Sequence, residues 1–472
     1  MKSNHFIIGT QGIFFGWLLS FPFHGPVFSA ISAERQLDAP SLILFFILVH
    51  AFTFLLGGLF LKQEALWKEL MLWSLVALTA STALLWFSSA TNTWMFAMGV
   101  KGAASALFIL GWSYPYSKGI PIVGRIKVMA STIILSNVVY ILFHLLSEVA
   151  SASLLLLCTF IPLAVSVLLV LRFPREMKQD SPQPEQMHPF PAIFMLIFCL
   201  FIFGLYLNSG IMYSVVFPSL TVPDYFFIYY RYIPYILVLV VMFFFGERLK
   251  RYFSAYMGAS LLGLAFVSFI VLAESPGTNF VMTQTLFEAA FAFLDLFAWT
   301  LLGDIAFIYG APFRIFGYAL AAMTGSIYMG GIISNRLAAA DESYYLIAAM
   351  FAVASIFLTA LVMPWLNERI NKDFFEKLIQ EKDEKNTSEK SVLERIMERM
   401  PEGTVLTPRE IEIVSLVLKG LTNREIAGEL FISENTLKTH LKNIYQKVQV
   451  TQKRELLSLA VRETNNQDTH PL

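Results

Sequence analysis

The chain has 472 residues, with 34 basic and 34 acidic side chains, so its formal net charge at pH 7 is zero. Hydrophobic residues make up 56% of it and charged residues 14%, whereas a soluble domain is typically about 45–50% apolar and about 25% charged. This composition excludes an ordinary soluble globular protein and favours lipid as the solvent for most of the chain.

The charges are unevenly distributed along the chain. Seventeen of the 34 Lys and Arg residues fall in the last 106 residues, and the other 17 in residues 1–366. Because such a change in composition marks a domain boundary, we expect a charge-poor domain over 1–366 and a charge-rich tail after it.

Twelve runs in the first part are long and apolar enough to cross a bilayer, which takes about 20 residues of helix. We therefore predict an all-α protein whose first domain is a polytopic bundle of twelve membrane-spanning helices. The predicted spans are 6–28, 41–61, 70–89, 94–115, 127–147, 151–171, 190–214, 225–245, 254–273, 280–302, 313–334 and 343–366.

A polar stretch, RFPREMKQDSPQPEQMHP at residues 172–189, divides the spans into six plus six. This layout resembles the topology of the major facilitator transporters. The charged signature that this family carries between spans two and three is absent here, where the loop reads GGLFLKQEALWKE. The resemblance implies a central cavity between two halves, with a ligand site near the midplane.

The loop charges predict an orientation, because Lys and Arg of short loops stay in the cytoplasm. With the N-terminus inside, the inner loops hold thirteen of these residues and the outer loops hold two, Arg35 and Arg336. An even number of spans then returns the C-terminus to the cytoplasm. We expect a multi-pass protein of the bacterial inner membrane with both termini cytoplasmic.

Ionisable side chains inside spans are expensive and point to function or to mutual pairing. The candidates are Lys101, Arg231, Glu288 and Asp295, of which the last two are seven residues apart and share one helix face. Two interpretations stay open. The two bases and two acids could neutralise each other, or some of them could bind an unknown small-molecule ligand.

The stretch YFFIYYRYIPY around Arg231 carries five tyrosines. They could stack on an aromatic ligand or line a cavity, or they could form an aromatic belt at the membrane interface. Elsewhere we find no nucleophile, metal-ligand or cofactor constellation, so we expect no enzyme activity, metal or cofactor. The two cysteines, Cys158 and Cys199, lie in apolar runs and suggest small buried fillers.

Residues 367–400 alternate acids and bases with few helix breakers, which predicts a charged helical linker. A solvated helix and a helix that pairs with its copy in a dimer both fit this pattern. The apolar stripe is interrupted between Glu381 and Ser391, which argues against a continuous coiled coil.

Residues 401–465 read as a compact helical domain. Thr407 with Glu410, and Thr422 with Glu425, have the spacing of capping boxes that begin helices. The first of these helices has a predicted apolar face of Ile411, Val414, Leu416 and Val417. A third helix begins after Ser433 and has a predicted buried face of Leu437, Leu441, Ile444 and Val448.

The opposite face of this third helix is polar and contains Glu434, Asn435, Lys438, Thr439 and Lys442. Such a mixture of donors and acceptors suits base edges in the major groove. From Ser433 to Arg454 there are five basic residues and one acid, so the local charge is positive, as phosphate contacts require.

The stretch LTPREIEIVSLVLKGLTNREIAGELFISENTLKTHLKNIYQKVQVTQKREL resembles the LuxR-type, or GerE-type, four-helix DNA-binding domain over about 60 residues. The resemblance implies that the third helix enters the major groove of operator DNA and that the fourth supports a homodimer. It implies base or backbone contacts by Asn435, Lys438, Thr439 and Lys442, and backbone contacts by Thr422, Asn423, Thr436 and Lys447.

The chain departs from the family pattern at three positions outside the reading face. Leu437 stands where Val is usual, and Val448 where Leu is usual, which keeps apolar bulk. Gln449 stands where Gly is common, so its backbone either takes or avoids the positive φ that Gly would adopt.

These features predict a membrane-anchored transcription regulator whose spans sense a small molecule and whose tail binds double-stranded DNA. The alternative is a major-facilitator-like transporter with a regulatory DNA-binding tail. Uptake into proteoliposomes distinguishes the two hypotheses.

Overall fold

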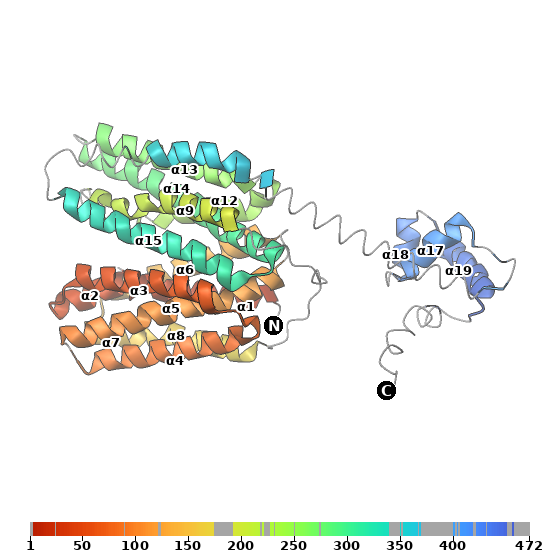
Figure 1. Ribbon diagram of the computed structural model, residues 1–472, viewed down its shortest axis with the longest axis horizontal. Coiled ribbons are helices and arrows are strands. Elements are labelled where there is room, and N and C mark those ends of the chain that lie inside the picture. Colours follow the sequence, from red (N-terminus) through yellow and green to blue (C-terminus); the bar gives the residue numbers. More distant parts are fainter. Residues whose placement is uncertain are drawn as a thin grey trace. The chain divides into compact units, whose positions relative to one another are not determined.

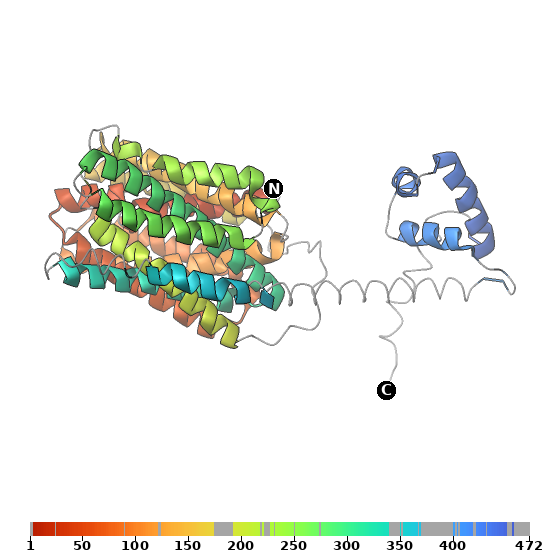
Figure 2. The ribbon, with the colours of Figure 1, turned by 90° about the horizontal axis from the view of Figure 1, so that it is seen from above.

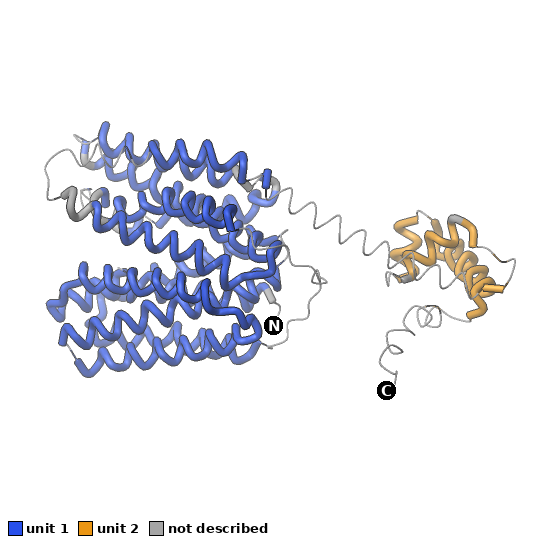
Figure 3. The backbone as a smooth tube through the Cα atoms, in the orientation of Figure 1, with its two compact units in different colours: residues 1–371 blue, residues 372–472 orange. Residues whose placement is uncertain are grey.

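The structure is a computed structural model that describes residues 3–23, 25–88, 90–120, 124–173, 192–217, 220, 227–230, 232–249, 251–272, 275–338, 350, 353–366, 368–369, 400–401, 404, 406–418, 422–430, 432–450 and 456. These residues form helices and turns without a β-strand, so the all-α prediction is confirmed for them. The chain divides into two compact units, residues 1–371 and 372–472 (Figure 3). The predicted linker over 367–400 lies almost wholly outside the described residues.

Unit 1 begins with helices that gather in one half of the bundle (Figure 1). They are α1 (Ser3–Ser20), α2 (Pro26–Glu34), α3 (Ala39–Phe60), α4 (Trp67–Trp86), α5 (Thr91–Gly119), α6 (Arg125–Ser147), α7 (Ala152–Cys158) and α8 (Phe160–Arg172). Within this half α4 packs against α5, and α1 packs against α6.

The other half of unit 1 follows the polar stretch in sequence. It contains α9 (Ala192–Ile211), a π-helical turn (Met212–Val216), α11 (Phe227–Tyr230), α12 (Tyr232–Phe245), α13 (Arg251–Val271), α14 (Pro276–Tyr309), α15 (Pro312–Ala338) and a helix over Val353–Leu366. Here α13 packs against α14, and α15 against α9. Seen from above, the helices of the unit run side by side (Figure 2).

Among the described residues, nine helices are long and apolar enough to cross a membrane. Helix α12 and the helix Val353–Leu366 are apolar but shorter. The prediction of a single helix over 6–28 is wrong, because α1 ends at Ser20 and α2 begins at Pro26 after the N-cap Gly25. The total of twelve spans therefore stays a prediction, whereas a multi-pass bundle is what the helices form.

Unit 2 is a small helical domain with its own core. It contains α17 (Pro408–Leu418), α18 (Asn423–Glu429) and α19 (Glu434–Val448). Both predicted capping boxes are confirmed, since Thr407 N donates to Glu410 Oε2 over 2.7 Å and Thr422 N to Glu425 Oε2 over 2.8 Å. Of the predicted fourth helix, only Leu456 is described, and it is buried.

The core of unit 2 confirms the predicted buried face of α19 and corrects that of α17. Leu437, Leu441, Ile444 and Val448 are all buried. In α17 the innermost residues are Ile413, Val414 and Val417, whereas Ile411 and Leu416 only pack against the core in part.

The two halves of unit 1 meet where α3 packs against α15 and α6 against α12. Gly58 of α3 and Gly317 of α15 are opposed so closely that a Cβ on Gly317 would lie 2.5 Å from the Gly58 Cα. Small residues at such crossings let membrane helices approach at backbone distance. Larger side chains at either position would separate the halves.

A buried ion pair also joins the halves. Arg125 Nη1 at the start of α6 lies 2.5 Å from Asp304 Oδ1 in α14, and both side chains are almost completely buried. The other guanidinium nitrogen, Nη2, donates to the carbonyls of Ser117 and Ile120. Gly303 makes room for this arrangement, because a Cβ there would lie 2.9 Å from the Arg125 Cδ.

We predict that Asp304→Asn lowers the free energy of unfolding by about 3 kcal/mol, because removing one partner of a buried pair leaves the other charge uncompensated. Unfolding of the detergent-purified protein measures the effect. Glu247→Gln is the matched control, since Glu247 and its partner Lys127, 3.5 Å apart, are both partly exposed and such pairs contribute less than about 1 kcal/mol. Equal losses in the two variants would contradict a special role for the buried pair.

Candidate nucleic-acid interface

Helix α19 presents a polar face to solvent. Ser433 caps it, with its Oγ accepting from the Thr436 backbone N–H over 3.1 Å, so the helix begins where the sequence predicts. Burial of its apolar face fixes the rotation of the helix. The predicted DNA-contacting side chains that this rotation exposes are Glu434, Asn435, Thr436, Lys438, Thr439 and Lys442.

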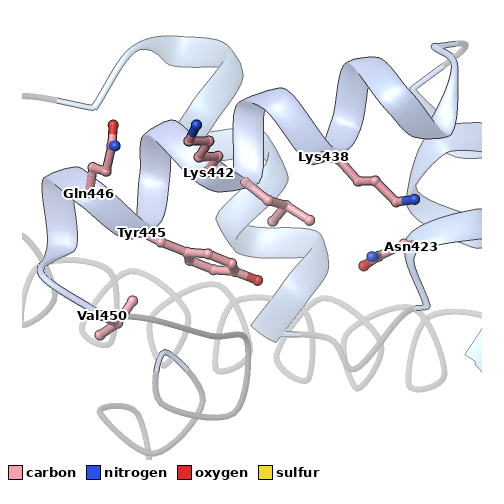
Figure 4. Close-up of a pocket in the computed structure, with 7 residues that line it drawn as sticks. Asn423, Lys438, Lys442, Tyr445, Gln446 and Val450 are labelled. Carbon is pink, nitrogen blue, oxygen red and sulfur yellow. The ribbon is translucent and has the colours of Figure 1, made fainter.

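Two lysines of this face are available to an external partner. Within the described part of the chain, Lys438 and Lys442 form no ion pair, and they are one helical turn apart. Together with Asn423 of α18 they line a hollow of about 340 Å³, completed by Leu441, Tyr445, Gln446 and Val450. Figure 4 shows the Asn423 and Lys438 side chains approaching each other across its rim.

The three threonines that are predicted to contact DNA also form hydrogen bonds within the domain. Thr422 caps α18 through Glu425, and its side chain is exposed. The hydroxyls of Thr436 and Thr439 bond to Ser433 Oγ and to the Asn435 carbonyl. These hydroxyls keep acceptor lone pairs, and their DNA contacts stay predictions.

Lys447 forms an ion pair with another residue of the tail domain. Its Nζ lies 2.6 Å from Glu410 Oε2, and the Glu410 side chain is only 5% exposed. Burial raises the pKa of Glu410, but hydrogen bonds from Lys447 and Thr407 outweigh it, so the pKa lies below its ordinary value. The sequence does not show this pair, because its partners are 37 residues apart. The predicted DNA contact of Lys447 stays a prediction beside this bond.

In the membrane unit, Lys101 lies in α5 and is completely buried. Its Nζ donates to Ser81 Oγ over 3.3 Å and to Thr82 Oγ1, both in α4. The ammonium also lies 5.0 Å from the ring centre of Phe21. Hydroxyls and an aromatic ring therefore stabilise this charge, and no acid of the described chain pairs with it.

The two predicted acids lie together on α14, where both are partly exposed. Asp295 accepts hydrogen bonds from the hydroxyls of Tyr206 and Tyr235, each over 2.7 Å. Glu288 accepts from Gln284 Nε2 over 2.8 Å. The structure therefore does not pair Asp295 with Lys101. The other predicted base, Arg231, lies outside the described residues.

The tyrosines of the stretch around Arg231 lie in two different environments. Tyr229, Tyr230 and Tyr232 line an apolar groove of about 440 Å³ with residues of α6 and α12. Tyr235 bonds to Asp295 instead, and Tyr225 lies outside the described residues. Three of the five tyrosines therefore line a groove, and both interpretations of the stretch stay predictions.

Residues 404–460 match the protein family described as bacterial regulatory proteins, luxR family. Over 59 residues the chain is 48% identical to the probable csgAB operon transcriptional regulatory protein of Salmonella typhimurium and to the CsgBAC operon transcriptional regulatory protein of Escherichia coli. Each alignment covers 12% of this chain and 27% of the relative. The regulator MalT of Serratia proteamaculans is 42% identical over 55 residues, which cover 12% of this chain and 6% of MalT.

The likeness to solved structures lies in the membrane unit. The major facilitator superfamily transporter FucP, in its outward conformation, aligns with a TM-score of 0.53 and 13% identity over 75% of this chain and 98% of FucP. The human organic anion transporter MFSD10 aligns with a TM-score of 0.55 and 12% identity over 76% of this chain and 98% of MFSD10. At these identities the likeness establishes the fold alone.

The tail is therefore a LuxR-type helix-turn-helix domain, a DNA-binding domain of transcription regulators, joined to a multi-pass membrane domain with the major facilitator fold. The relatives are transcription regulators and the structural neighbours are transporters. The matched segment spans about a quarter or less of those regulators.

We predict that Glu410→Gln lowers the stability of the tail domain by about 2 kcal/mol at neutral pH, since it removes a charge-assisted bond to Lys447 and weakens the cap of α17. Because the folded-state pKa of Glu410 is lowered, its contribution is present above the ordinary glutamate pKa of about 4.3 and is lost as the pH falls through the folded-state value. Urea unfolding of the tail fragment across this acid range should show a smaller pH dependence for the variant. Identical pH profiles would contradict the assignment.

Proposed function

We propose that the protein is a membrane-anchored transcription regulator of the bacterial inner membrane, with both termini in the cytoplasm. Its membrane domain senses a small molecule, and its tail binds operator DNA as a homodimer. The observation that carries the proposal is the exposed polar face of α19, which presents Lys438 and Lys442 to solvent in the same chain as a membrane bundle.

The physical case for DNA binding is electrostatic and geometric. Phosphate neutralisation requires exposed cations, and base reading requires side chains near the N-terminus of an exposed helix. Helix α19 provides both, with Glu434 and Asn435 in its first turn and the lysines on the next two turns. The internal bonds of Thr422 and Thr436 hold the ends of α18 and α19 in fixed geometry.

The signal is proposed to pass directly along the chain. The helix Val353–Leu366 is the last one described in unit 1, and the predicted linker follows it in sequence. A change in the spacing of two membrane domains would alter the effective concentration of one tail for the second half-site. Affinity would then change without any new protein–DNA contact.

The second candidate function is transport, with the tail regulating or reporting flux. Its support is the major facilitator fold of unit 1. A fold hosts many functions, so solute uptake into proteoliposomes is the test. Uptake driven by the purified protein would favour this candidate over sensing alone.

We predict that Lys438→Ala with Lys442→Ala abolishes discrete DNA occupancy in the host, because it removes two exposed positive charges from the proposed reading face. Genome-wide occupancy of the intact protein is the measurement. The matched control is Lys382→Ala with Lys385→Ala, which makes the same change of net charge in the linker. Loss of peaks in both variants, or in neither, would contradict the proposed interface.

We further predict that operator affinity of the full-length protein depends on the ligand state of the membrane domain, because both parts share one chain. The measurement is DNA binding by protein in nanodiscs, with and without cell-derived small molecules. The tail fragment is the control and should show no dependence. A full-length protein that binds its operator equally under both conditions would overturn the sensing function while leaving DNA binding intact.

A further inference from the structure

An apolar groove lies where the two halves of the membrane unit meet. Its volume is about 440 Å³, within the range of about 300–1,000 Å³ that is usual for ligand sites. Ile141 of α6 lines it from the first half, and residues of α11 and α12 line it from the second. Because α6 and α12 also pack against each other, the groove belongs to the junction of the halves.

The open side of this groove faces the lipid rather than the interior of the bundle. Ile233, Leu237 and Val240 line it and are 51%, 59% and 37% exposed. On the opposite side of α12, Leu239 and Met242 are buried. Apolar side chains that a multi-pass bundle exposes on its outer surface contact hydrocarbon, because contact with water would be costly. Hydrocarbon is therefore the medium in contact with the groove.

The tyrosines at one end of the groove have their hydroxyls engaged within the protein. The Tyr232 hydroxyl is hydrogen-bonded to His144 Nδ1 over 2.7 Å, and the Tyr230 hydroxyl to Thr285 Oγ1 over 2.8 Å. The described lining is almost wholly apolar as a result. A ligand rich in hydrogen-bonding groups would leave them without partners here, so the lining favours a hydrocarbon chain.

The length of the groove matches one leaflet of a bilayer. From Tyr232 to Val240 the helix rises by about 12 Å, at about 1.5 Å per residue. The hydrocarbon core of a bilayer is about 30 Å thick, so one leaflet occupies about 15 Å of it. A chain lying along the groove therefore stays within one leaflet, as the acyl chain of a phospholipid does.

Dispersion favours the groove over the rest of the outer surface. Lipid tails are as apolar as the side chains they touch, so the hydrophobic effect does not select one position around the bundle. A chain in a groove touches protein on two sides, whereas a chain on a convex helix touches it on one. Since each atomic contact adds a small attraction, the groove holds a chain longer than a ridge does.

We propose that the groove between α6 and α12 binds an acyl chain of a bilayer phospholipid. The chain contacts Ile141 of one half and Ile236 and Leu237 of the other at the same time. A shift between the halves changes the width of the groove, so chain occupancy and the arrangement of the halves influence each other. The proposal goes beyond the regulator function and does not depend on it, because the groove is the same whether the domain senses or transports.

The first test uses the wild-type, full-length protein in phospholipid nanodiscs. The probe is a phosphatidylcholine with a diazirine in the middle of one acyl chain, and mass spectrometry locates the label after illumination. Leu237 and Leu200 of α9 are matched, since each is a leucine that is 59% exposed and only Leu237 lines the groove. We expect Leu237 to be labelled several times more than Leu200. Equal or weaker labelling of Leu237 overturns the proposal without the need for a variant.

Variants then fill the groove. Ile141→Trp fills it from α6 and Ile236→Trp from α12, and each should lower the labelling of Leu237 to the level of Leu200. Leu142→Trp is the matched control, because Leu142 adjoins Ile141, is 60% exposed and lies outside the lining. Unchanged labelling in both filling variants, or an equal loss in Leu142→Trp, overturns the assignment.

A second copy of the chain is the alternative occupant. Leu237→Cys in native membranes should give no more disulfide-linked dimer under oxidation than the wild type, which has Cys158 and Cys199. Additional dimer in the variant would place a second copy on the groove and overturn the proposal. These measurements involve no DNA, so loss of lipid labelling leaves the regulator function standing, and loss of DNA occupancy leaves the groove proposal standing.

Discussion

The absence of water in the hydrocarbon core is the constraint on which the membrane unit depends. Backbone groups there must bond within the chain, which restricts the spans to helices. Every charge there must also find a partner. Lys101, within α5, finds hydroxyls and an aromatic ring; Arg125, buried at the start of α6, likewise finds Asp304 and two carbonyls. These contacts fix the positions of the helices relative to one another, because each contact joins helices that are distant in sequence.

The same constraint places polar groups of the bundle at contacts between its two halves. The ion pair of Arg125 with Asp304 and the packing of Trp299 hold the two halves together at one level of α14. Asp295 precedes Trp299 by four residues on the same face of α14, whereas Asp304, nine residues after Asp295, lies on the opposite side of the helix. Asp295 therefore lies on the helix that also carries contacts between the two halves. In a rigid, closely packed bundle, a change at such a contact is transmitted as a shift of helices rather than absorbed locally.

The sequence predicted local features well and long-range pairing poorly. Capping boxes, the apolar face of α19 and the shared face of Glu288 and Asp295 follow from spacings of three to seven residues, and the structure has them. The pair of Arg125 with Asp304 joins residues 179 apart, and Asp304 falls just beyond the predicted span over 280–302. The phenol donors of Asp295 come from two other helices. No periodicity within one helix could reveal either arrangement.

Some differences between the predicted and the observed structure have causes in the local sequence. Gly25 and Pro26 interrupt the first apolar run, because proline removes a backbone donor and begins a new helix readily. The turn after α19 is a second case. Gln449 adopts φ 55°, the left-handed conformation that glycine usually provides. Sequence alone left that angle open; in the structure the turn closes with the Val450 N–H donating to the Tyr445 carbonyl over 2.9 Å, and Val448 and Val450 pack on the core on either side of it.

A charged side chain has a different energetic cost in the two units, because one lies in the bilayer and the other in water. In water an unpaired lysine costs little, so Lys438 and Lys442 are distinguished by their position on one face of a fixed helix rather than by lacking counter-ions. In the bilayer a carboxylate needs partners, and Asp295 has the hydroxyls of Tyr206 and Tyr235. Position on an exposed, fixed helix is therefore what distinguishes the face of α19 that we propose binds DNA. In the proposed regulator, a change in the packing of the membrane helices would have to reach the tail through the chain that joins the two units.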